Sequence, residues 1–315
     1  MNKKWLALLI ALCFASVGTA IAGGRGDTAS GKLKISLITM DSIDEHWLKV
    51  KAGAEKKAAE LGNVALTFAA PAGKVDANAQ LQLVEDAITK QAQAIILAPL
   101  HAEALIPGVE KAKAAGIPVI HVDCAVNKPI YDAFFATDNG GAARLAADEL
   151  AKRIGGKGKI AIVNAQAGAS TTMLRENEFR AQIKEKYPDI EIIGVQYSDG
   201  DKTKALNQAQ DFMVANPDLK GFYGCNEGSS VGVGQAVLQA GKAGQIMVVG
   251  FDFSNDTKAL IEQGAMQATM VQNPFVMGYE GLAAAVACIQ GEKMNGKTVD
   301  TGVTVVTKDN LASVK

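Results

Sequence analysis

Residues 77–123 read ANAQLQLVEDAITKQAQAIILAPLHAEALIPGVEKAKAAGIPVIHVD, and two kinds of pattern alternate along them. Two amphipathic segments, 77–90 and 102–115, alternate with two short apolar runs, 94–97 and 118–122. In the first segment the apolar residues favour one stripe, which indicates a helix that packs one face on a sheet. The apolar runs lack polar alternation, as expected of strands covered on both faces. The stretch therefore predicts helices alternating with parallel strands.

The same alternation runs twice along the chain, over about 33–122 and about 158–250. Further strands are predicted at 34–40, 65–69, 159–163, 190–195, 221–224, 246–250 and 266–271. Further helices are predicted at 47–61, 140–153, 173–187, 202–215, 229–240, 257–263 and 275–289. Residues 134–139, FFATDN, are interpreted as a connection between the two runs. The sequence thus predicts an α/β protein with two doubly wound parallel-sheet lobes, in which ligands bind beyond the carboxyl ends of the strands.

The first 22 residues have the parts of an export signal. Lys3 and Lys4 precede an apolar run over 5–16, WLALLIALCFAS, and residues 20–22, AIA, form a small-residue cleavage site. The apolar run is shorter than the roughly 20 residues that span a bilayer, so a retained anchor is the weaker interpretation. We expect cleavage after Ala22 and a mature protein in the periplasm.

The composition of the mature chain excludes several classes of protein. Cleavage leaves 293 of the 315 residues, enough for two lobes of ordinary size. There are 30 lysines and arginines against 33 acidic residues, so nucleic acid is a poor partner. Three cysteines remain, Cys124, Cys225 and Cys288, and neither their number nor their spacing suits a disulfide framework or a zinc site. We expect buried free thiols and no metal or cofactor.

A cluster of polar and aromatic residues follows the first predicted strand. Residues 41–47, DSIDEHW, include Asp44, His46 and Trp47, the only tryptophan of the mature chain. Helix capping explains Asp44, because acids are favourable at the positive end of a helix. Trp47 has two interpretations, a packing residue or an indole that stacks on the apolar face of a sugar ring. The polar neighbours favour a ligand site.

Two aspartates occupy matching positions just past apolar runs. Asp123 follows residues 118–122, and Asp252 follows residues 248–251, VVGF. A carboxylate can accept paired hydrogen bonds from vicinal hydroxyls, and such charge-assisted bonds are strong. Turn capping explains either aspartate alone. As a matched pair they favour ligand binding.

Three further candidates lie at strand ends or helix starts. Asn226 and Gln272 each close a predicted strand and offer both hydrogen-bond donors and acceptors. Arg175 is predicted in the first turn of a helix, an unfavourable place for a cation. A surface ion pair with Glu176 or Glu178 is one explanation, and a ligand role is the other.

The sequence gives little support to an enzyme. The patterns G-x-S-x-G and H-E-x-x-H and the P-loop are absent, and His46, His101 and His121 have no evident nucleophile partner. Residues 232–234, GVG, start like a dinucleotide fingerprint but lie inside a predicted helix and lack the third glycine. They indicate helix packing.

In their order along the chain, these residues resemble the ribose-binding-protein branch of the periplasmic sugar-binding proteins, the type I solute receptors of ABC importers. The resemblance covers nearly all of residues 33–308. It rests on the turn after the first strand, the strand-end aspartate, the R-x-x-G-F, N-D/E and G-F-D motifs, and the hinge glutamine. The ligand residues that it implies are Asp44, His46, Trp47, Asp123, Cys124, Arg175, Asn226, Asp252 and Gln272.

The chain departs from the family pattern in its predicted site. Cys124 stands where ribose binders carry Arg, and Asp44 and His46 stand where they carry Asn or Phe. Glu178 replaces the glycine of the R-x-x-G-F motif, and a second-lobe aromatic aligns with Gly200. The loss of one cation and one stacking face argues against ribose and leaves room for a longer, more acyclic or differently charged ligand.

The resemblance implies two lobes joined by three crossings, near 137–138, 272–273 and 301–302. The N-terminal lobe would contain residues 33–137 and 273–301, and the C-terminal lobe residues 138–272 and 302–315. The protein would close around a small sugar or polyol and deliver it to the permease of an ABC importer. We expect a monomer.

Three alternatives remain open at this point. The same ligand could be handed to a chemoreceptor for chemotaxis or signalling. A LacI-type regulator shares the two-lobed fold, but it would need DNA-binding helices where this chain has an export signal. A secreted enzyme would turn over its ligand.

Overall fold

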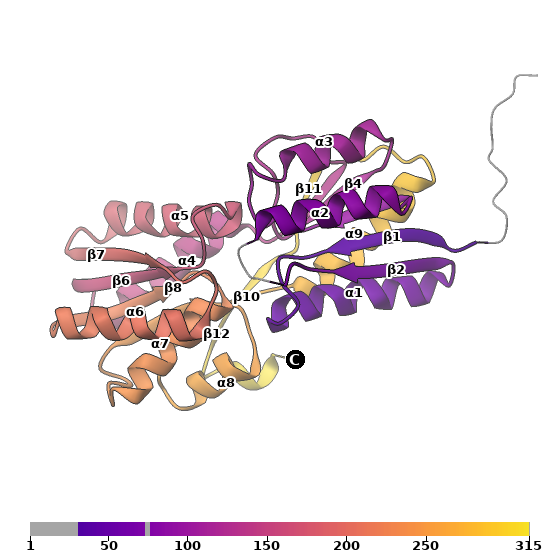
Figure 1. The fold of residues 1–315 in the computed structure, drawn as a ribbon. Coiled ribbons are helices and arrows are strands. Elements are labelled where there is room, and N and C mark those ends of the chain that lie inside the picture. Colours follow the sequence, from indigo (N-terminus) through magenta and orange to yellow (C-terminus); the bar gives the residue numbers. More distant parts are fainter. Residues whose placement is uncertain (1–30, 73–75, 315) are drawn as a thin grey trace, which may run out of the picture. The chain divides into compact units, whose positions relative to one another are not determined.

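The computed structural model describes residues 31–72 and 76–314, and from Lys32 onward the chain forms one compact unit. The predicted export signal, with its cleavage site after Ala22, lies outside the described residues. The described part contains two six-stranded sheets, each covered by helices (Figure 1). This is the predicted α/β class.

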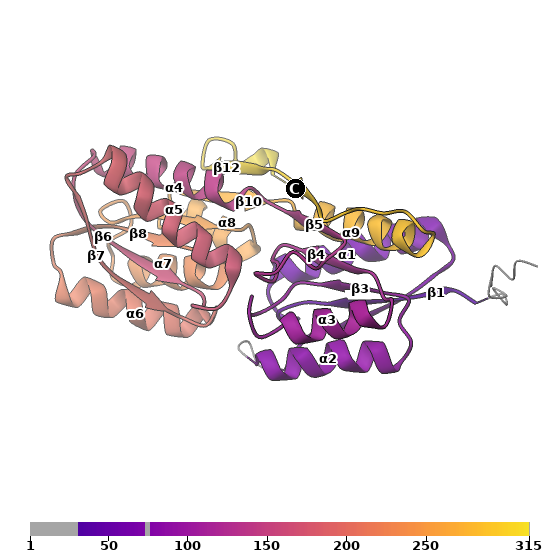
Figure 2. The ribbon, with the colours of Figure 1, turned by 90° about the horizontal axis from the view of Figure 1, so that it is seen from above.

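All strands of the first sheet run parallel, in the spatial order β11-β5-β4-β3-β1-β2. The strands are β1 (Leu33–Ile38), β2 (Val64–Ala69), β3 (Ala94–Leu97), β4 (Val119–Val122), β5 (Ala133–Ala136) and β11 (Lys297–Asp300). Helices cover both faces of the sheet (Figure 2), with α1 (Glu45–Leu61) and α9 (Pro274–Ile289) on one, and α2 (Ala77–Thr89) and α3 (Ile106–Ala114) on the other.

The second sheet repeats this order over five strands and ends in an antiparallel one, β12-β10-β9-β8-β6-β7. The strands are β6 (Gly158–Asn164), β7 (Ile190–Tyr197), β8 (Leu219–Gly224), β9 (Met247–Phe251), β10 (Ala268–Gln272) and β12 (Val303–Thr307). The helices are α4 (Asn139–Ile154), α5 (Ser170–Lys186), α6 (Lys202–Ala215), α7 (Glu227–Gln239), α8 (Asn255–Glu262) and the short η1 (Leu311–Ser313). In each sheet the strand order reverses beside the first strand, β1 or β6, which is where ligands bind in such folds.

The chain passes from one sheet to the other three times, after β5, after β10 and after β11. The crossing segments are bonded to one another. Thr137 Oγ1 donates to the carbonyl of Gly302 (3.3 Å), and Asn273 Nδ2 donates to the carbonyl of Thr301 (2.7 Å).

The interiors of the strands are apolar, as predicted, because helices cover both faces. Every residue of β3 and β4 is buried, including His121. The His121 Nδ1 lies 3.1 Å from the carbonyl oxygen of Leu97. Burial lowers the pKa of His121 to about 4, so this imidazole is neutral at pH 7.

Close helix packing positions α1, the helix that begins beside the predicted site. A Cβ on Gly53 of α1 would lie 2.0 Å from the carbonyl oxygen of Phe275, and one on Gly278 of α9 would lie 1.9 Å from that of Val50. The two helices can therefore touch only because both positions are glycine.

The structure corrects the sequence prediction at several elements. β5 was assigned to a connection, and β11 and β12 were missed. β5 has only four residues, while β11 and β12 lie at sheet edges without a continuous buried run. Helix α5 begins at Ser170 rather than 173, which places Arg175 in the second turn instead of the first.

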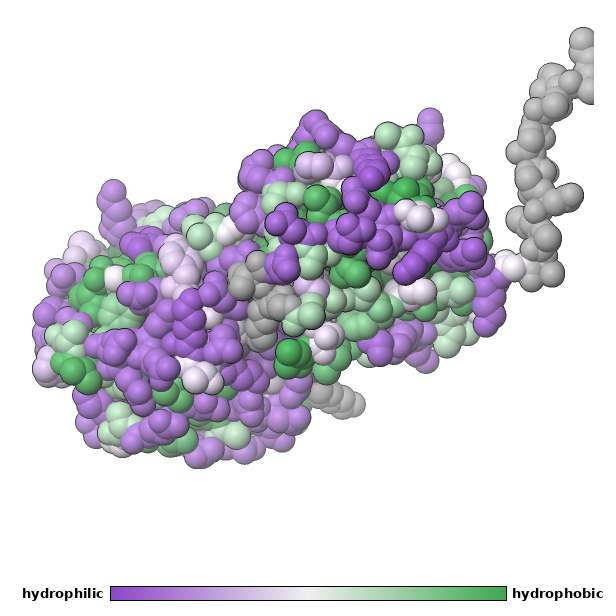
Figure 3. Space-filling model, in the orientation of Figure 1, coloured by the Kyte–Doolittle hydropathy of each residue, from purple (hydrophilic) through white to green (hydrophobic). Residues whose placement is uncertain are grey.

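Helix α3 also begins later than predicted, at Ile106 rather than 102. The Nδ1 of His101 accepts hydrogen bonds from the backbone N–H groups of Glu103 (3.2 Å) and Ala104 (3.3 Å), which holds residues 101–104 in a turn. Among the described residues no helix is long and apolar enough to cross a membrane. Figure 3 shows hydrophilic residues over much of the face in view, with smaller hydrophobic areas between them.

Candidate functional site

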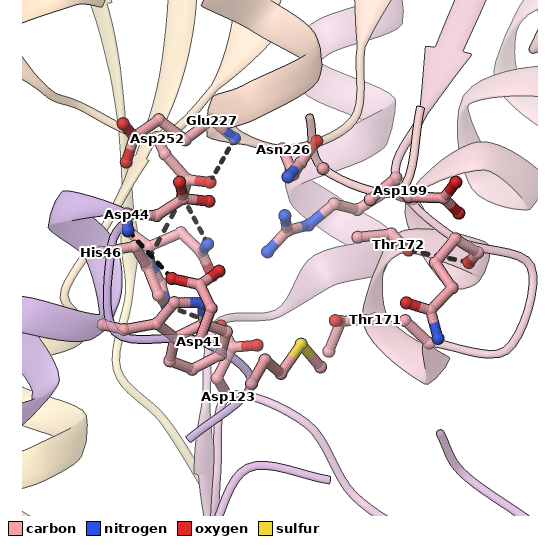
Figure 4. A pocket seen from close by; sticks show the side chains of 18 residues that line it. Asp41, Asp44, His46, Asp123, Thr171, Thr172, Asp199, Asn226, Glu227 and Asp252 are labelled. Atoms are coloured by element: carbon pink, nitrogen blue, oxygen red, sulfur yellow. Dashed lines mark hydrogen bonds and ion pairs between the residues drawn. The ribbon is translucent and has the colours of Figure 1, made fainter. Parts of the chain in front are cut away.

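A cavity of about 600 Å³, partly open to solvent, lies at the carboxyl ends of strands from both sheets. Figure 4 shows Asp44 and His46 on one side of it and Thr171 and Thr172 on the other. Eight of the nine predicted ligand residues line this cavity, although they come from distant parts of the chain. They are Asp44, His46, Trp47, Asp123, Arg175, Asn226, Asp252 and Gln272.

His46 lies between two carboxylates that belong to different sheets. Its Nε2 is 3.1 Å from Asp123 Oδ1, and its Nδ1 is 3.5 Å from Asp252 Oδ1. Burial alone would lower the pKa of His46, but the charges of Asp123 and Asp252 outweigh burial and raise it to about 10. An imidazolium therefore joins the ends of β4 and β9 at neutral pH.

The two aspartates show the reciprocal effect. Burial would raise the pKa of each carboxyl group, but the charge of His46, followed by that of Arg175, holds the pKa of Asp123 and of Asp252 below the ordinary value. Both carboxylates stay ionised although they are buried. Two charged carboxylates therefore line the cavity.

Asp252 is the centre of a hydrogen-bond network at the end of β9. Gln272 Nε2 donates to Asp252 Oδ1 (2.6 Å), and the backbone N–H of Glu227 donates to Asp252 Oδ2 (3.0 Å). The other amide atom of Gln272, Oε1, is buried and has no hydrogen-bond partner within the described residues. It is an acceptor available to a ligand.

Arg175 is not the surface residue that a pair with Glu176 or Glu178 would require. It is 2% exposed, and its guanidinium lies 4.0 Å from the ring centre of Phe251. Its Nε donates to Asn139 Oδ1 (2.6 Å) and its Nη1 to the carbonyl of Cys225 (2.9 Å). Glu176 and Glu178 pair instead with Arg180 and Arg144.

Those contacts occupy two of the three nitrogens of Arg175. The third, Nη2, is buried and has no hydrogen-bond partner among the residues that the structure describes. Because a buried charged donor without a partner is costly, this atom indicates a missing acceptor at the cavity.

Cys124 differs from its prediction as a ligand residue, because it does not line the cavity. Its Sγ, fully buried, donates to Asp123 Oδ2 (2.9 Å) and lies 2.9 Å from Thr171 Oγ1. Burial and the charge of Asp123 raise the pKa of the thiol. Cys225 is also fully buried, as expected of a free thiol, whereas Cys288 is only partly buried. In the described ranges no cluster of His, Cys, Asp and Glu suits a metal ion.

Asn226, Asp44 and Trp47 have structural contacts beside their place on the cavity wall. Asn226 Oδ1 accepts from Ser229 N–H (3.1 Å) and so caps α7. Asp44 precedes α1 but makes no capping bond through its side chain. Trp47 is 6% exposed, belongs to the core beneath α1, and meets the His46 ring edge-to-face at 4.7 Å.

Sequence reasoning missed Glu227, which lines the cavity beside Asn226. Its side chain is buried, neither carboxyl oxygen accepts a hydrogen bond from a described residue, and Lys202 Nζ lies 3.3 Å from Oε1. Burial raises the pKa of Glu227 to about 6, and the charges of Asp44 and Asp252 add to this effect. Its position at the start of α7, just after the turn that follows β8, was the available signal.

Other lining residues were also missed. Asp199 and Gly200 follow β7, so the rule that located Asp123 applies to them as well. Asp41 begins the polar cluster over 41–47 but was not singled out within it. The remaining lining residues carry no motif: Met40, Ala165, Gln166, Ala169, Thr171 and Thr172.

The chain has two largely parallel sheets joined by three crossings, and a polar cavity lies at the strand ends of both. This arrangement defines a type I periplasmic binding protein fold. Comparisons with known proteins agree. The model of the periplasmic binding protein domain family matches residues 35–293. The chain is 31% identical to the D-allose-binding periplasmic protein of Escherichia coli, over 85% of this chain and 88% of that protein. It is 29% identical to the ribose import binding protein RbsB of Salmonella typhimurium, over 94% and 96%.

Solved structures give the same result. An ABC transporter solute-binding protein from Agrobacterium vitis with bound D-fucose is 37% identical, with a TM-score of 0.86 over 88% of this chain and 96% of that one. A carbohydrate transporter solute-binding protein from Agrobacterium radiobacter in complex with D-arabinose is 33% identical, with a TM-score of 0.86 over 89% and 96%. The chain belongs to the periplasmic binding protein family. It is a solute-binding protein of the carbohydrate-importer class, whose members bind and transport rather than catalyse.

Proposed function

We propose that the cavity between the two sheets holds one small sugar or polyol. The observation that carries this proposal is the pair of open hydrogen-bonding atoms at its wall, the buried donor Arg175 Nη2 and the buried acceptor Gln272 Oε1. A hydroxyl group can both accept and donate, so a ligand with several hydroxyls can satisfy both atoms. Asp123 and Asp252 add fixed carboxylate acceptors, and Asn226 adds an amide.

The lining of the cavity supports a single small ligand. Polar side chains from both sheets converge on it, as they do at small-molecule sites. In this proposal Trp47 covers an apolar face of the ligand, while His46 fixes the aspartates. Two similar proteins are named for D-allose and ribose, and two similar solved structures contain D-fucose and D-arabinose. All four sugars are small polyhydroxylated molecules.

Delivery requires two states of the protein. In the proposed cycle the three crossings bend, the ligand favours the closed arrangement because it contacts both lobes there, and the closed protein docks on an ABC permease. The lobes would be residues 33–137 with 273–301, and residues 138–272 with 302–315. The predicted export signal over residues 1–22 supports a periplasmic carrier, which we propose acts as a monomer.

A thermal-shift screen of residues 23–315 tests this function. The panel contains pentoses, hexoses, deoxysugars and polyols, each at high concentration. A ligand at about 100 times its Kd stabilises its binding protein by about 2.7 kcal/mol, which raises Tm by several degrees for lobes of this size. We expect shifts confined to one stereochemical series. No shift across the whole panel would exclude a sugar or polyol as the ligand.

A further inference from the structure

Two loops that follow strands of different sheets meet at the edge of the cavity, where Gln166 is part of the lining. Residues 100–102 follow β3, and residues 166–168 follow β6; we call these two segments the rim. The backbone N–H of Ala102 donates to the carbonyl of Gly168 (3.0 Å), and Gln166 Nε2 donates to the carbonyl of Leu100 (3.2 Å). These bonds are formed between protein groups alone, so they need no ligand.

Residue 168 must be a glycine because His101, in the other loop of the rim, occupies the space that a side chain would need. A Cβ at this position would lie 2.1 Å from Cδ2 and 2.8 Å from Cγ of His101, far closer than atoms can approach. Gly168 does not have the left-handed backbone that would demand glycine for another reason. The imidazole cannot easily move away, because its Nδ1 accepts the backbone N–H groups of Glu103 and Ala104. The imidazole ring of His101 therefore packs directly on the backbone of Gly168.

A second set of ligand-independent contacts lies at α1. Lys49 Nζ donates to the carbonyl of Phe253 (2.8 Å), and Asn255 donates to Glu45 Oε1 from both its backbone N–H and its Nδ2 (3.2 Å each). His46 and Thr171 lie on opposite sides of the cavity (Figure 4). Along the chain, His46 is three residues before Lys49, and Thr171 is three residues after Gly168. The two lobes are thus bonded to each other at two separate places.

We infer that the rim holds the two lobes closed without ligand, so that the free protein already populates the closed arrangement, and that Gly168 and His101 set ligand affinity without touching the ligand. The inference rests on the proposed function, because it assumes that the lobes open and close. Apparent affinity scales with the fraction of protein in the binding-competent state, so a change that removes the closed arrangement weakens binding in proportion. Gly168 and His101 are positioning residues in this account.

The test uses residues 23–315 and three variants. Gly168→Ala introduces the clash with His101, and the double variant Gly168→Ala/His101→Ala removes it again. Gly140→Ala is the matched control, because a Cβ there would meet only ordinary contacts at 3.5 Å and 3.6 Å and its backbone is not left-handed. Each protein is measured by small-angle X-ray scattering without ligand and by calorimetric titration with the best ligand of the thermal-shift panel.

We expect Gly168→Ala to bind at least about tenfold more weakly and to have a larger radius of gyration without ligand than the parent protein. The double variant should recover both values, and Gly140→Ala should not differ from the parent. A merely structural glycine would leave the ligand-free radius of gyration of the folded protein unchanged. Equal ligand-free scattering of the parent and Gly168→Ala, or a loss of affinity that persists in the double variant, would overturn the inference. If no ligand binds the parent protein, the proposed function fails, while the ligand-free scattering still decides the role of the rim.

Discussion

Asp123 and Asp252 occupy equivalent positions in the two sheets. Each directly follows its strand, each has a left-handed backbone (φ 61° and 72°), and each donates its backbone N–H to the next strand, at Phe135 O (2.8 Å) and Met270 O (2.9 Å). Because non-glycine residues rarely adopt such angles, the turn aims each carboxylate at a definite place. Both carboxylates meet the imidazole of His46. The internal duplication of the fold therefore supplies one charged acceptor from each lobe.

Replacing Asp252 should weaken ligand binding strongly. Asp252→Ala removes an acceptor and leaves Gln272 Nε2 and the Glu227 N–H without their partner, so we expect a loss of about 2 kcal/mol or more, about 30-fold in Kd. Asp252→Asn is the companion variant, because Asn tolerates a positive φ and so separates the lost charge from backbone strain. Calorimetric titration gives the affinities. An unchanged Kd for Asp252→Ala would remove Asp252 from the site.

Replacing His46 should change the stability of the protein at alkaline pH. The folded pKa of about 10 exceeds the ordinary value of 6.5, so the imidazolium contributes stability that is full below pH 6.5 and is lost as pH rises to about 10. The expected slope in this window is up to about 1.4 kcal/mol per pH unit. His46→Gln should lack it. Urea unfolding at several pH values measures the slope, and equal slopes for both proteins would contradict a charged His46.

Replacing His121 should change the stability at acidic pH, with the opposite sign. Its folded pKa of about 4 lies below 6.5, so its contribution is present above pH 6.5 and is lost as pH falls towards 4. The full effect is roughly 3 kcal/mol. Protonation of Glu227, whose pKa is raised to about 6, adds stability between about pH 6 and 4.5 and partly offsets this loss. The difference between the parent and His121→Gln isolates the His121 effect, and parallel curves would disprove it.

Even a conservative replacement of Arg175 should weaken ligand binding. The guanidinium of Arg175 bonds Asn139 and Cys225 and stacks on the Phe251 ring, and its Nη2 remains for the cavity. The ammonium of a lysine has no planar set of donors and cannot make all of these contacts at once. We expect Arg175→Lys to cost about 2 kcal/mol or more in affinity. Arg180→Lys, at a half-exposed pair with Glu176, serves as the control and should bind like the parent. Equal affinities for the two variants would show that Arg175 is only structural.

The secondary structure could be predicted from the sequence where local side-chain pattern alone identifies a helix or strand. The buried apolar runs of β3, β4 and β9 gave a clear pattern. The edge strands β11 and β12 showed no such pattern in the sequence, because their pairing depends on partners far away along the chain.

The site was readable in part, for the same reason. Asp123 and Asp252 follow their strands directly, so a rule about strand ends finds them. The ion pairs of His46 and the burial of Arg175 depend on residues between 36 and 206 positions away, and no local pattern contains them. Cys124 shows the converse, because its neighbour Asp123 faces the cavity while its own side chain turns into the interior.

A crystal structure of residues 23–315 with the best ligand of the thermal-shift panel would show which side chains hold the ligand. We predict one ligand between the lobes, with its oxygen atoms within hydrogen-bonding distance of Arg175 Nη2, Gln272 Oε1 and at least one of the two strand-end aspartates. A ligand bound elsewhere, or one that leaves Arg175 Nη2 and Gln272 Oε1 unpaired, would contradict the account.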